Sequence, residues 1–281
     1  MIALLDIQAP AKLNLFLHIT GRRPDGYHLL QSVFALIDWC DTLHFERRQD
    51  GRISREDLGL TLPADDLVVR AARALQAATG TSSGAHIAID KQIPAQAGMG
   101  GGSSDAAACL LALNHLWNLR LSLAELSRIG LALGADVPFF LAGRNAWVEG
   151  VGERITPIDL EAADYIVVKP SQGLPTERIF SDAALKRDTN TATLSGFAAN
   201  PKGFGCNDLQ PVAQRLCPEV TQGLEWLASL GLTGRMTGSG SAVFAWADRA
   251  IDLDKPPIGF QVRQCRGLDV HPLVGWAPSE D

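Results

Sequence analysis

A glycine-rich segment, residues 94–105, places the strongest constraint on how this chain can fold. Four of the five residues from 98 to 102 are glycine. Glycines permit positive φ and leave no Cβ in the way of a ligand, so successive N–H groups can point to one spot. The segment runs into a helical pattern with Ala106, Leu110 and Leu113 on one face, and the start of a helix favours an anion. We therefore expect a phosphate-binding loop that opens a helix.

Other glycine motifs fit this loop less well than a phosphate-binding loop does. A nucleoside-triphosphate loop of the type G-x-x-x-x-G-K-[ST] needs a lysine that is absent here, and the dinucleotide pattern G-x-G-x-x-G fails because Ser103 stands at its last position. The simpler reading is a flexible loop whose serine caps the helix. A cap alone does not require so many glycines, so the phosphate loop is the preferred interpretation.

The rest of the chain mixes strands and helices without strict alternation, which predicts an α+β fold. Residues 11–20 alternate with period two, as a strand does. Asp65 or Asp66 can cap a helix that Gly80 stops, and Ser122 with Glu125 forms a capping box for another helix. Further strands are expected at residues 29–48, 86–90, 146–149 and 165–168, and further helices at 208–216 and 219–230. A tight loop at 237–241 precedes an apolar run.

Composition limits the possible partners. The chain has 281 residues, with 25 Lys and Arg against 31 Asp and Glu, which gives a net charge of −6. An acidic chain without a long basic run is a poor binder of nucleic acid or of anionic membranes. No apolar stretch approaches the ~20 residues that a membrane span needs, and the N-terminus lacks the pattern of a signal peptide. Five scattered cysteines suggest reduced thiols, so we expect a cytoplasmic protein without nucleic-acid or membrane partners.

Three segments together resemble the GHMP kinase superfamily, which includes the galactokinases, homoserine kinases and mevalonate kinases. They are the glycine loop, residues 10–15 (Pro-Ala-Lys-Leu-Asn-Leu) and residues 237–244 (Thr-Gly-Ser-Gly-Ser-Ala-Val-Phe). The resemblance implies the two-domain GHMP fold, with a ribosomal-protein-S5-like domain over residues 1–155 and a ferredoxin-like domain over residues 156–281. It also implies that ATP and the substrate bind in the cleft between them.

Other segments are similar to one branch of that superfamily. Residues 21–28 contain Asp-Gly-Tyr-His, residues 134–140 contain Gly-Ala-Asp-Val-Pro, and residues 149–153 read Glu-Gly-Val-Gly-Glu. That branch phosphorylates the 2-hydroxyl of 4-diphosphocytidyl-2-C-methyl-D-erythritol in non-mevalonate isoprenoid biosynthesis. The resemblance implies this small molecule as substrate, contacted by Asn14, Tyr27, His28, Val151, Thr176 and Phe180. For Phe180, packing in the core is an equally good interpretation.

The same resemblance implies that Lys12 and Asp136 are the catalytic pair. Asp136 would act as the general base on the hydroxyl, and the ammonium of Lys12 would orient that carboxylate and offset developing charge. Without the resemblance, Asp136 reads as the cap of a helix that begins before Pro138. Lys12 by itself reads as a solvated lysine on a strand.

ATP is the expected phosphoryl donor, and Mg²⁺ is expected to shield its phosphates, although no ligands can be assigned to the ion. The expected ATP-binding residues are Asp66, Lys91, Pro94, Ala95, Gln96, Ala97, Gly98, Met99, Gly100, Gly101, Gly102, Ser103 and Ser104. Position 66 is Asp where the family pattern usually has Asn, so a carboxylate replaces the amide at this expected nucleotide contact. The chain is expected to act as a monomer or a homodimer.

Two other functions remain open from the sequence. Another GHMP kinase, of the mevalonate or homoserine type, would share the loop but has no need of the Tyr27–His28 pair. A member without catalytic activity, which only senses a nucleotide or metabolite, would not need both Lys12 and Asp136.

Overall fold

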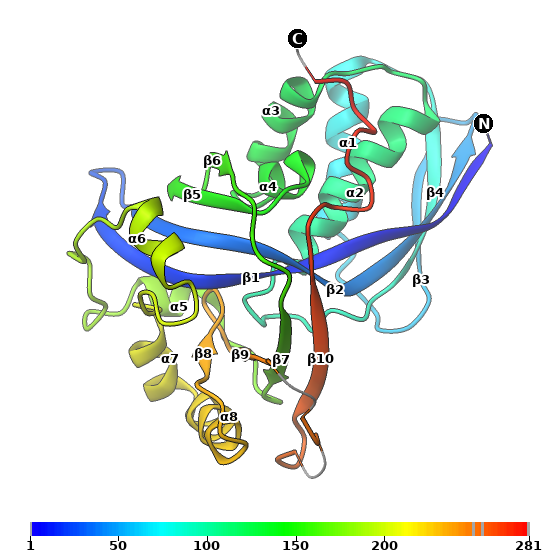
Figure 1. The fold of residues 1–281 in the computed structure, drawn as a ribbon. Coiled ribbons are helices and arrows are strands. Elements are labelled where there is room, and N and C mark those ends of the chain that lie inside the picture. Colours follow the sequence, from blue (N-terminus) through cyan, green and yellow to red (C-terminus); the bar gives the residue numbers. More distant parts are fainter. Residues whose placement is uncertain (1, 249–250, 254–255, 280–281) are drawn as a thin grey trace.

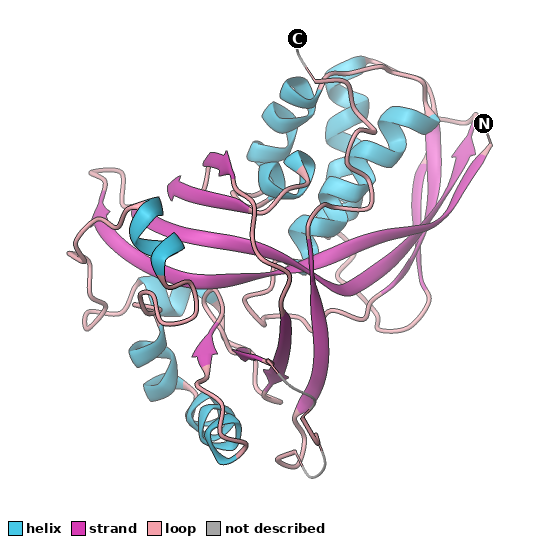
Figure 2. Cartoon of the chain, in the orientation of Figure 1, coloured by secondary structure: helices cyan, strands magenta, loops and turns pink. Residues whose placement is uncertain are grey.

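The computed structural model describes residues 2–248, 251–253 and 256–279 (Figures 1 and 2). In this part of the chain the strands are β1 (Ala3–Arg22), β2 (His28–Arg48), β3 (Ile53–Asp57), β4 (Gly84–Asp90), β5 (Ala146–Gly150), β6 (Arg154–Pro157), β7 (Asp164–Lys169), β8 (Arg235–Met236), β9 (Val243–Trp246) and β10 (Gln261–Leu268). The helices are α1 (Leu67–Thr79), α2 (Gly101–Leu116), α3 (Leu123–Leu133), α4 (Val137–Ala142), α5 (Thr176–Phe180), α6 (Leu194–Ala199), α7 (Gln210–Leu216) and α8 (Pro218–Ser229).

The long strand β2 organises the sheet. One of its edges pairs antiparallel with β1 over most of its length. Its other edge pairs in turn with β5 near its start, with β10 near its middle and with β4 near its end. β10 continues into a second group of strands in the order β10–β7–β9–β8. Figure 1 shows β1 and β2 running together across the centre of the molecule, with β5 and β6 above them and β7–β10 below.

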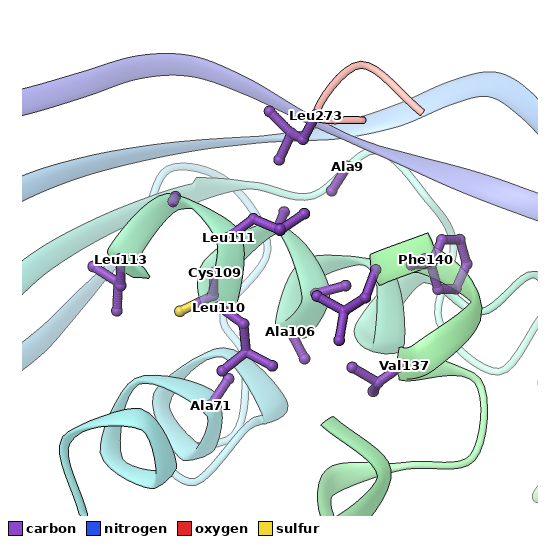
Figure 3. Packing of buried hydrophobic residues seen from close by; sticks show 14 of the residues in the cluster. Ala9, Ala71, Ala106, Cys109, Leu110, Leu111, Leu113, Val137, Phe140 and Leu273 are labelled. Carbon is purple, nitrogen blue, oxygen red and sulfur yellow. The ribbon is translucent and has the colours of Figure 1, made fainter. Parts of the chain in front are cut away.

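Helices α1–α4 cover one side of this sheet, and their ends follow the local sequence. Asp66 caps α1 by accepting a hydrogen bond from the Val69 N–H, and Gly80 ends that helix in the left-handed conformation. Ser122 and Glu125 form the expected capping box of α3. α2 lies in the middle of the layer, and it is buried on almost every side by α1, α4 and the sheet (Figure 3).

Two further groups of buried side chains join the halves of the chain. One packs β1 and β2 against β7, β9 and β10, and includes Leu13, Phe16, Val167 and Phe244. The other packs α7 and α8 against β7 and β9. A substantial part of the core therefore comes from residues far apart in the sequence.

The α+β mixture and most of the expected elements are confirmed, while several short ones were not predicted. β3, α5, α6 and β10 have no clear pattern in the sequence, because each is short or only half buried. α4 begins where the interpretation of Asp136 as a helix cap places a helix. Residues 271–278 return to the helical layer, where the His271 N–H donates to the Gly143 carbonyl and the Leu123 N–H donates to the Pro278 carbonyl. Among the described residues, no helix has the length and apolar character needed to cross a bilayer.

Candidate functional site

The glycine loop and the start of α2 line a cavity of about 230 Å³. Gly100 is the N-cap of α2 with φ of +71°, and no side chain caps this helix. The free N–H groups of the first turn are therefore available to an anion. The cavity is lined by Leu67, Lys91, Ile93, Pro94, Ala95, Gln96, Ala97, Met99, Gly100, Gly101, Gly102 and Ser103.

The loop at 237–241 packs against the glycine loop and binds its backbone. The Ser241 and Ala242 N–H groups donate to the carbonyls of Gln96 and Ala97. A Cβ on Gly98 would lie 2.2 Å from the Thr237 carbonyl oxygen, and one on Gly238 would lie 2.5 Å from the Gly98 carbonyl oxygen. The absence of side chains at both positions is what lets the two backbones meet.

Lys91 lies beside the glycine loop in a buried cluster of charges. Its Nζ is 2.6 Å from Asp105 Oδ2 and also binds the Asp41 carboxylate. Burial opposes the charge on Lys91, but the two carboxylates outweigh it and raise its pKa. Burial, with repulsion from Asp41, raises the pKa of Asp105 well above its usual range against the attraction of Lys91. Asp105 Oδ1 is buried and has no hydrogen-bond partner in the part of the chain that the structure describes.

Two of the expected nucleotide residues do not face this cavity. The Asp66 carboxylate is used by the cap of α1 and by Arg55, whose Nη1 lies 2.8 Å away. Ser104 is fully buried, and its hydroxyl donates to the Pro10 carbonyl at 2.7 Å. Because these polar groups are already paired inside the protein, their contribution is to hold the loop and the neighbouring helix in place.

A second and larger cavity, of about 590 Å³, lies where the 22–28 turn approaches α5. It collects five of the six expected substrate residues, namely Tyr27, His28, Val151, Thr176 and Phe180. The other lining residues, which the sequence did not single out, are Arg22, Asp25, Gly26, Leu30, Ala135, Glu177 and Ser181. Asp25, Gly26 and Ala135 belong to motifs that carry the family resemblance, and the other four residues could have been indicated only by their closeness to the 25–28 and 176–180 segments.

Three side chains with flat rings, those of Tyr27, His28 and Phe180, contribute to the walls of this second cavity. Tyr27 is 64% exposed and lines the cavity, so its ring is open to a ligand. The rings of His28 and Phe180 lie 5.0 Å apart at 39°. Phe180 also packs against the hydrophobic core, which confirms the interpretation as a core residue. It lines the cavity as well, and its contact with a substrate stays a prediction. A flat heteroaromatic ring could stack in such a cavity.

Lys12 and Asp136 lie between the two cavities. The Lys12 Nζ is 3.6 Å from Asp136 Oδ2. The side chain of Lys12 also passes close to the glycine loop, because its Cε lies 3.3 Å from the position that a Cβ on Gly100 would take. Asp136 is adjacent to Ala135, which lines the larger cavity. It stands at the N-cap of α4, but its carboxylate makes no capping hydrogen bond. The carboxylate is 30% exposed and so remains accessible to a ligand.

The surroundings of Lys12 stabilise its position. The residue is only 3% exposed, so the interpretation as a solvated lysine is wrong. Its ammonium binds the Asn14 amide oxygen and lies 4.4 Å from the centre of the Phe34 ring. Burial lowers the pKa of Lys12, and Asp136 partly opposes that change.

Asn14, the sixth expected substrate residue, does not line the larger cavity. Its amide oxygen accepts from Lys12 and its amide nitrogen donates to the Ser32 hydroxyl at 2.9 Å. Both ends of the side chain are thus paired within the protein, and the residue orients Lys12. The alternating pattern of the strand placed Lys12 and Asn14 on the same side, but it did not reveal this contact.

No cluster of metal ligands accompanies these groups. Among the residues that the structure describes, no three His, Cys, Asp or Glu side chains gather in a way that could hold a metal ion. A cation at this site would therefore depend mainly on oxygen atoms of a bound ligand and on water.

Two family models match the chain on either side of its middle. The model of the GHMP kinases N terminal domain matches residues 66–144, which include the glycine loop and Asp136. The model of the GHMP kinases C terminal domain matches residues 192–255, which include the supporting loop at 237–241.

Curated relatives match over the full length. A protein of Albidiferax ferrireducens named 4-diphosphocytidyl-2-C-methyl-D-erythritol kinase is 71% identical over 280 residues, covering 100% of this chain and 98% of its own. The protein of the same name in Paracidovorax citrulli is 65% identical over 285 residues and is covered completely, as is this chain.

Solved structures agree with the fold. A crystal structure of 4-(cytidine 5'-diphospho)-2C-methyl-D-erythritol kinase is 33% identical with a TM-score of 0.77, covering 92% of this chain and 98% of that one. A homoserine kinase from Cytophaga hutchinsonii gives a TM-score of 0.70 at 14% identity and covers 96% of both chains. The second likeness shows the fold alone.

Proposed function

The chain belongs to the GHMP kinase family, and from this premise we propose that it transfers the γ-phosphoryl group of ATP to the 2-hydroxyl of 4-diphosphocytidyl-2-C-methyl-D-erythritol. The products would be the 2-phosphate and ADP, within the non-mevalonate route to isoprenoid precursors. The observation that carries this proposal is the position of Lys12 and Asp136 between a glycine-loop cavity and a cavity with aromatic walls.

The glycine-loop cavity is the proposed site of the ATP phosphates. Its backbone N–H groups and the positive end of the α2 dipole stabilise anionic charge, and neither is counted in the net charge of the side chains. Lys91 adds a cation at its edge, already oriented by Asp41 and Asp105. Asp66 and Ser104 support the cavity walls through the contacts described above. This arrangement reconciles an acidic protein with two polyanionic ligands.

Asp136 is the proposed base and Lys12 its electrostatic partner. A tertiary hydroxyl is a crowded nucleophile, so it gains from a carboxylate that accepts its proton as the new O–P bond forms. Lys12 lies on the loop side of Asp136, where its ammonium can counter the charge that builds up on the transferred group. Asn14 and Phe34 hold the ammonium there.

The larger cavity is the proposed site of the cytidine. Tyr27 and Phe180 offer faces for stacking, and His28 and Thr176 offer polar atoms at the edge of the ring. Val151 and Ala135 form the wall next to Asp136, which would direct the methylerythritol unit toward the base. Arg22 lies at the same cavity and is suited to the diphosphate.

Mg²⁺ is proposed to arrive with ATP. When bound, the ion shields the β- and γ-phosphates and so lowers the barrier to transfer. The described residues form no dedicated cation site, and the roles of Lys12, Asp136 and the glycine loop do not depend on its ligands.

We also propose that the enzyme works in the cytoplasm, where ATP is available, as a monomer or a homodimer.

The decisive experiment measures ADP release by the purified protein with three substrates: the diphosphocytidyl compound, mevalonate and homoserine. We expect release only with the first, and a new phosphate monoester on its product by phosphorus NMR. Turnover of mevalonate or homoserine instead would assign the chain to another GHMP activity. Binding of the nucleotide without ADP release from any of the three would make it a sensor.

The substitution Asp136→Asn tests the catalytic assignment. We expect kcat to fall by about 10²-fold or more, because the amide cannot accept the proton, while the affinity for ATP stays nearly unchanged. Asp65→Asn is the matched control, since this carboxylate is 71% exposed and pairs with Arg73, whose side chain is exposed as well. Near-normal turnover of the Asp136 variant would remove that residue from the mechanism.

A further inference from the structure

Arg187 lies behind the proposed cytidine cavity, and it does not line that cavity itself. We propose that Arg187 is a positioning residue, which holds His28 as the neutral tautomer protonated on Nδ1 and joins it to the segment that carries Phe180. The cavity would then present an N–H donor to an acceptor atom of the pyrimidine. This inference rests on the proposed function for the identity of the ligand, but not for the state of His28.

The contacts of Arg187 use its planar group on three sides. Its Nε donates to His28 Nε2 at 3.0 Å. Its Nη2 donates to the carbonyls of Phe180 at 3.3 Å and Asp182 at 2.8 Å, and its Nη1 donates to the Leu185 carbonyl at 2.9 Å. One side chain thus connects the first residue of β2 with the end of α5, two elements that are about 150 positions apart in the sequence.

The direction of the bond to His28 determines where its proton lies. A guanidinium group has only donors, so His28 Nε2 must carry a lone pair. In a neutral imidazole the proton is then on Nδ1. Among the described residues, no hydrogen-bond partner of Nδ1 is found within the protein, and His28 lines the cavity. Nδ1–H is therefore the polar atom of this ring that is left for a ligand.

The charges around His28 keep it neutral. Burial lowers its pKa, and the positive charges of Arg187 and of Arg22 at the end of β1 lower it further. Asp25 in the turn and Glu177 on α5 line the same cavity and carry the opposite charge. Protonation would also place an N–H of His28 against the N–H of Arg187, which removes the hydrogen bond.

The stacking wall depends on the same contact. The His28 and Phe180 rings are 5.0 Å apart, and Arg187 binds a side-chain atom of the first and a backbone atom of the second. Cytosine offers two adjacent acceptors, O2 and N3, on one edge. A fixed donor beside a fixed aromatic face can bind that edge without first paying for the ordering of either group.

The first measurement is the tautomer of His28 in the wild-type enzyme without ligand. Protein labelled with ¹⁵N-histidine is recorded by NMR at pH 7.5, and the His28 signals are assigned by their loss in a His28→Gln variant. We expect the proton on Nδ1. A proton on Nε2 would overturn the proposal whatever the substrate proves to be.

The second measurement compares the variants Arg187→Met, Arg187→Lys and Arg178→Met. Arg178 is an exposed arginine on α5 and serves as the matched control. For Arg187→Met we expect the KM for the diphosphocytidyl substrate to rise ~10-fold, with kcat and the KM for ATP within ~3-fold of wild type. In both proteins KM for this substrate should increase as the pH is lowered. In Arg187→Met this increase should begin at a higher pH than in wild type, because the pKa of His28 moves back up toward its ordinary value.

Arg187→Lys retains one donor for His28 Nε2, so it should keep the Nδ1 tautomer and restore part of the KM. If Arg187→Met lowers kcat and raises both KM values alike while the tautomer is unchanged, Arg187 only supports the loop and the proposal is wrong. Should Arg187→Met fail to fold, the wild-type tautomer and the Arg187→Lys variant still decide. Absence of turnover in wild type would contradict the proposed function, and the NMR result would remain a separate test.

Discussion

Gly98 and Gly238 illustrate how single residues set the geometry of the site. Their backbones meet where the two loops cross, at distances that no side chain would allow. Both also have positive φ, at +72° and +52°. The sequence already indicated that the glycines of 238–240 let the two loops approach, and the structure shows that Gly98 and Gly238 are where the two backbones meet.

Gly98→Ala should destabilise the protein by about 2–4 kcal/mol, since it adds a severe overlap with the Thr237 carbonyl to the cost of a left-handed alanine. Gly80→Ala is the control, because Gly80 has a similar φ of +64° and nothing within 4 Å. It should cost only about 1 kcal/mol. Urea denaturation measures the unfolding free energy of both variants. Equal losses of unfolding free energy would mean that the two loops can move apart without cost.

Other residues acquire a role only through partners that are remote in the chain. Lys12 and Asp136 are 124 positions apart, and the strand pattern left Lys12 as a solvated side chain. Its burial under Phe34 and Asn14 is a tertiary property. The resemblance to a family supplied the pairing that the residues alone did not.

At the scale of elements, the sequence predicted the helix caps, but it did not predict several short or half-buried strands and helices. Asp66, Gly80 and the Ser122–Glu125 box act within one turn of a helix, so their chemistry is local and the sequence predicts them. β10 and the segment after it have no comparable signal. They are held by β2, β7 and the helical layer, which the chain reaches only at its end.

The final segment contains a histidine that makes stability depend on pH. His271 is 1% exposed, and its Nδ1 accepts from the Leu273 N–H. Its Nε2 is buried and finds no partner among the residues that the structure describes. Burial lowers its pKa to about 4. The folded protein therefore holds His271 neutral, and the stability that this provides is full above about pH 6.5 and is lost as the pH falls toward 4.

His271→Asn should remove that dependence, because an amide oxygen can still accept from the Leu273 N–H but does not titrate. Between pH 7 and pH 4, wild type should lose about 3 kcal/mol more of its unfolding free energy than the variant. Urea titrations at several pH values measure the difference. Parallel pH curves for the two proteins would show that His271 is accessible to protons in the folded state.

At the scale of the whole molecule, we propose that the two sequence domains, 1–155 and 156–281, form one folding unit. The two family matches lie on either side of that boundary, which supports the division of the sequence. The packing crosses it, however: Leu13 and Phe16 share a cluster with Val167 and Phe244, and residues 271–278 pack on the helices of the first part (Figure 1).

A fragment of residues 1–155 should consequently fail to unfold cooperatively. It would expose the apolar side chains of β1 and β2 that β7, β9 and β10 cover, and it would lose the pairing of β10 with β2. Near-ultraviolet circular dichroism and a urea titration test this, with the full chain as control. A sharp transition in the fragment would establish an independent first domain.

The sequence by itself determined the α+β class, the capped helices and a glycine loop that opens a helix, because each depends on the chemistry of neighbouring residues. It also carried the family resemblance that named the candidate site. The tertiary structure alone decided which groups meet: the burial of Lys12 beside Asp136, the pairing of Asp66 and Ser104 away from the cavity, and the bond from Arg187 to His28. These contacts join residues tens to hundreds of positions apart, and the packing of the whole chain sets their distances.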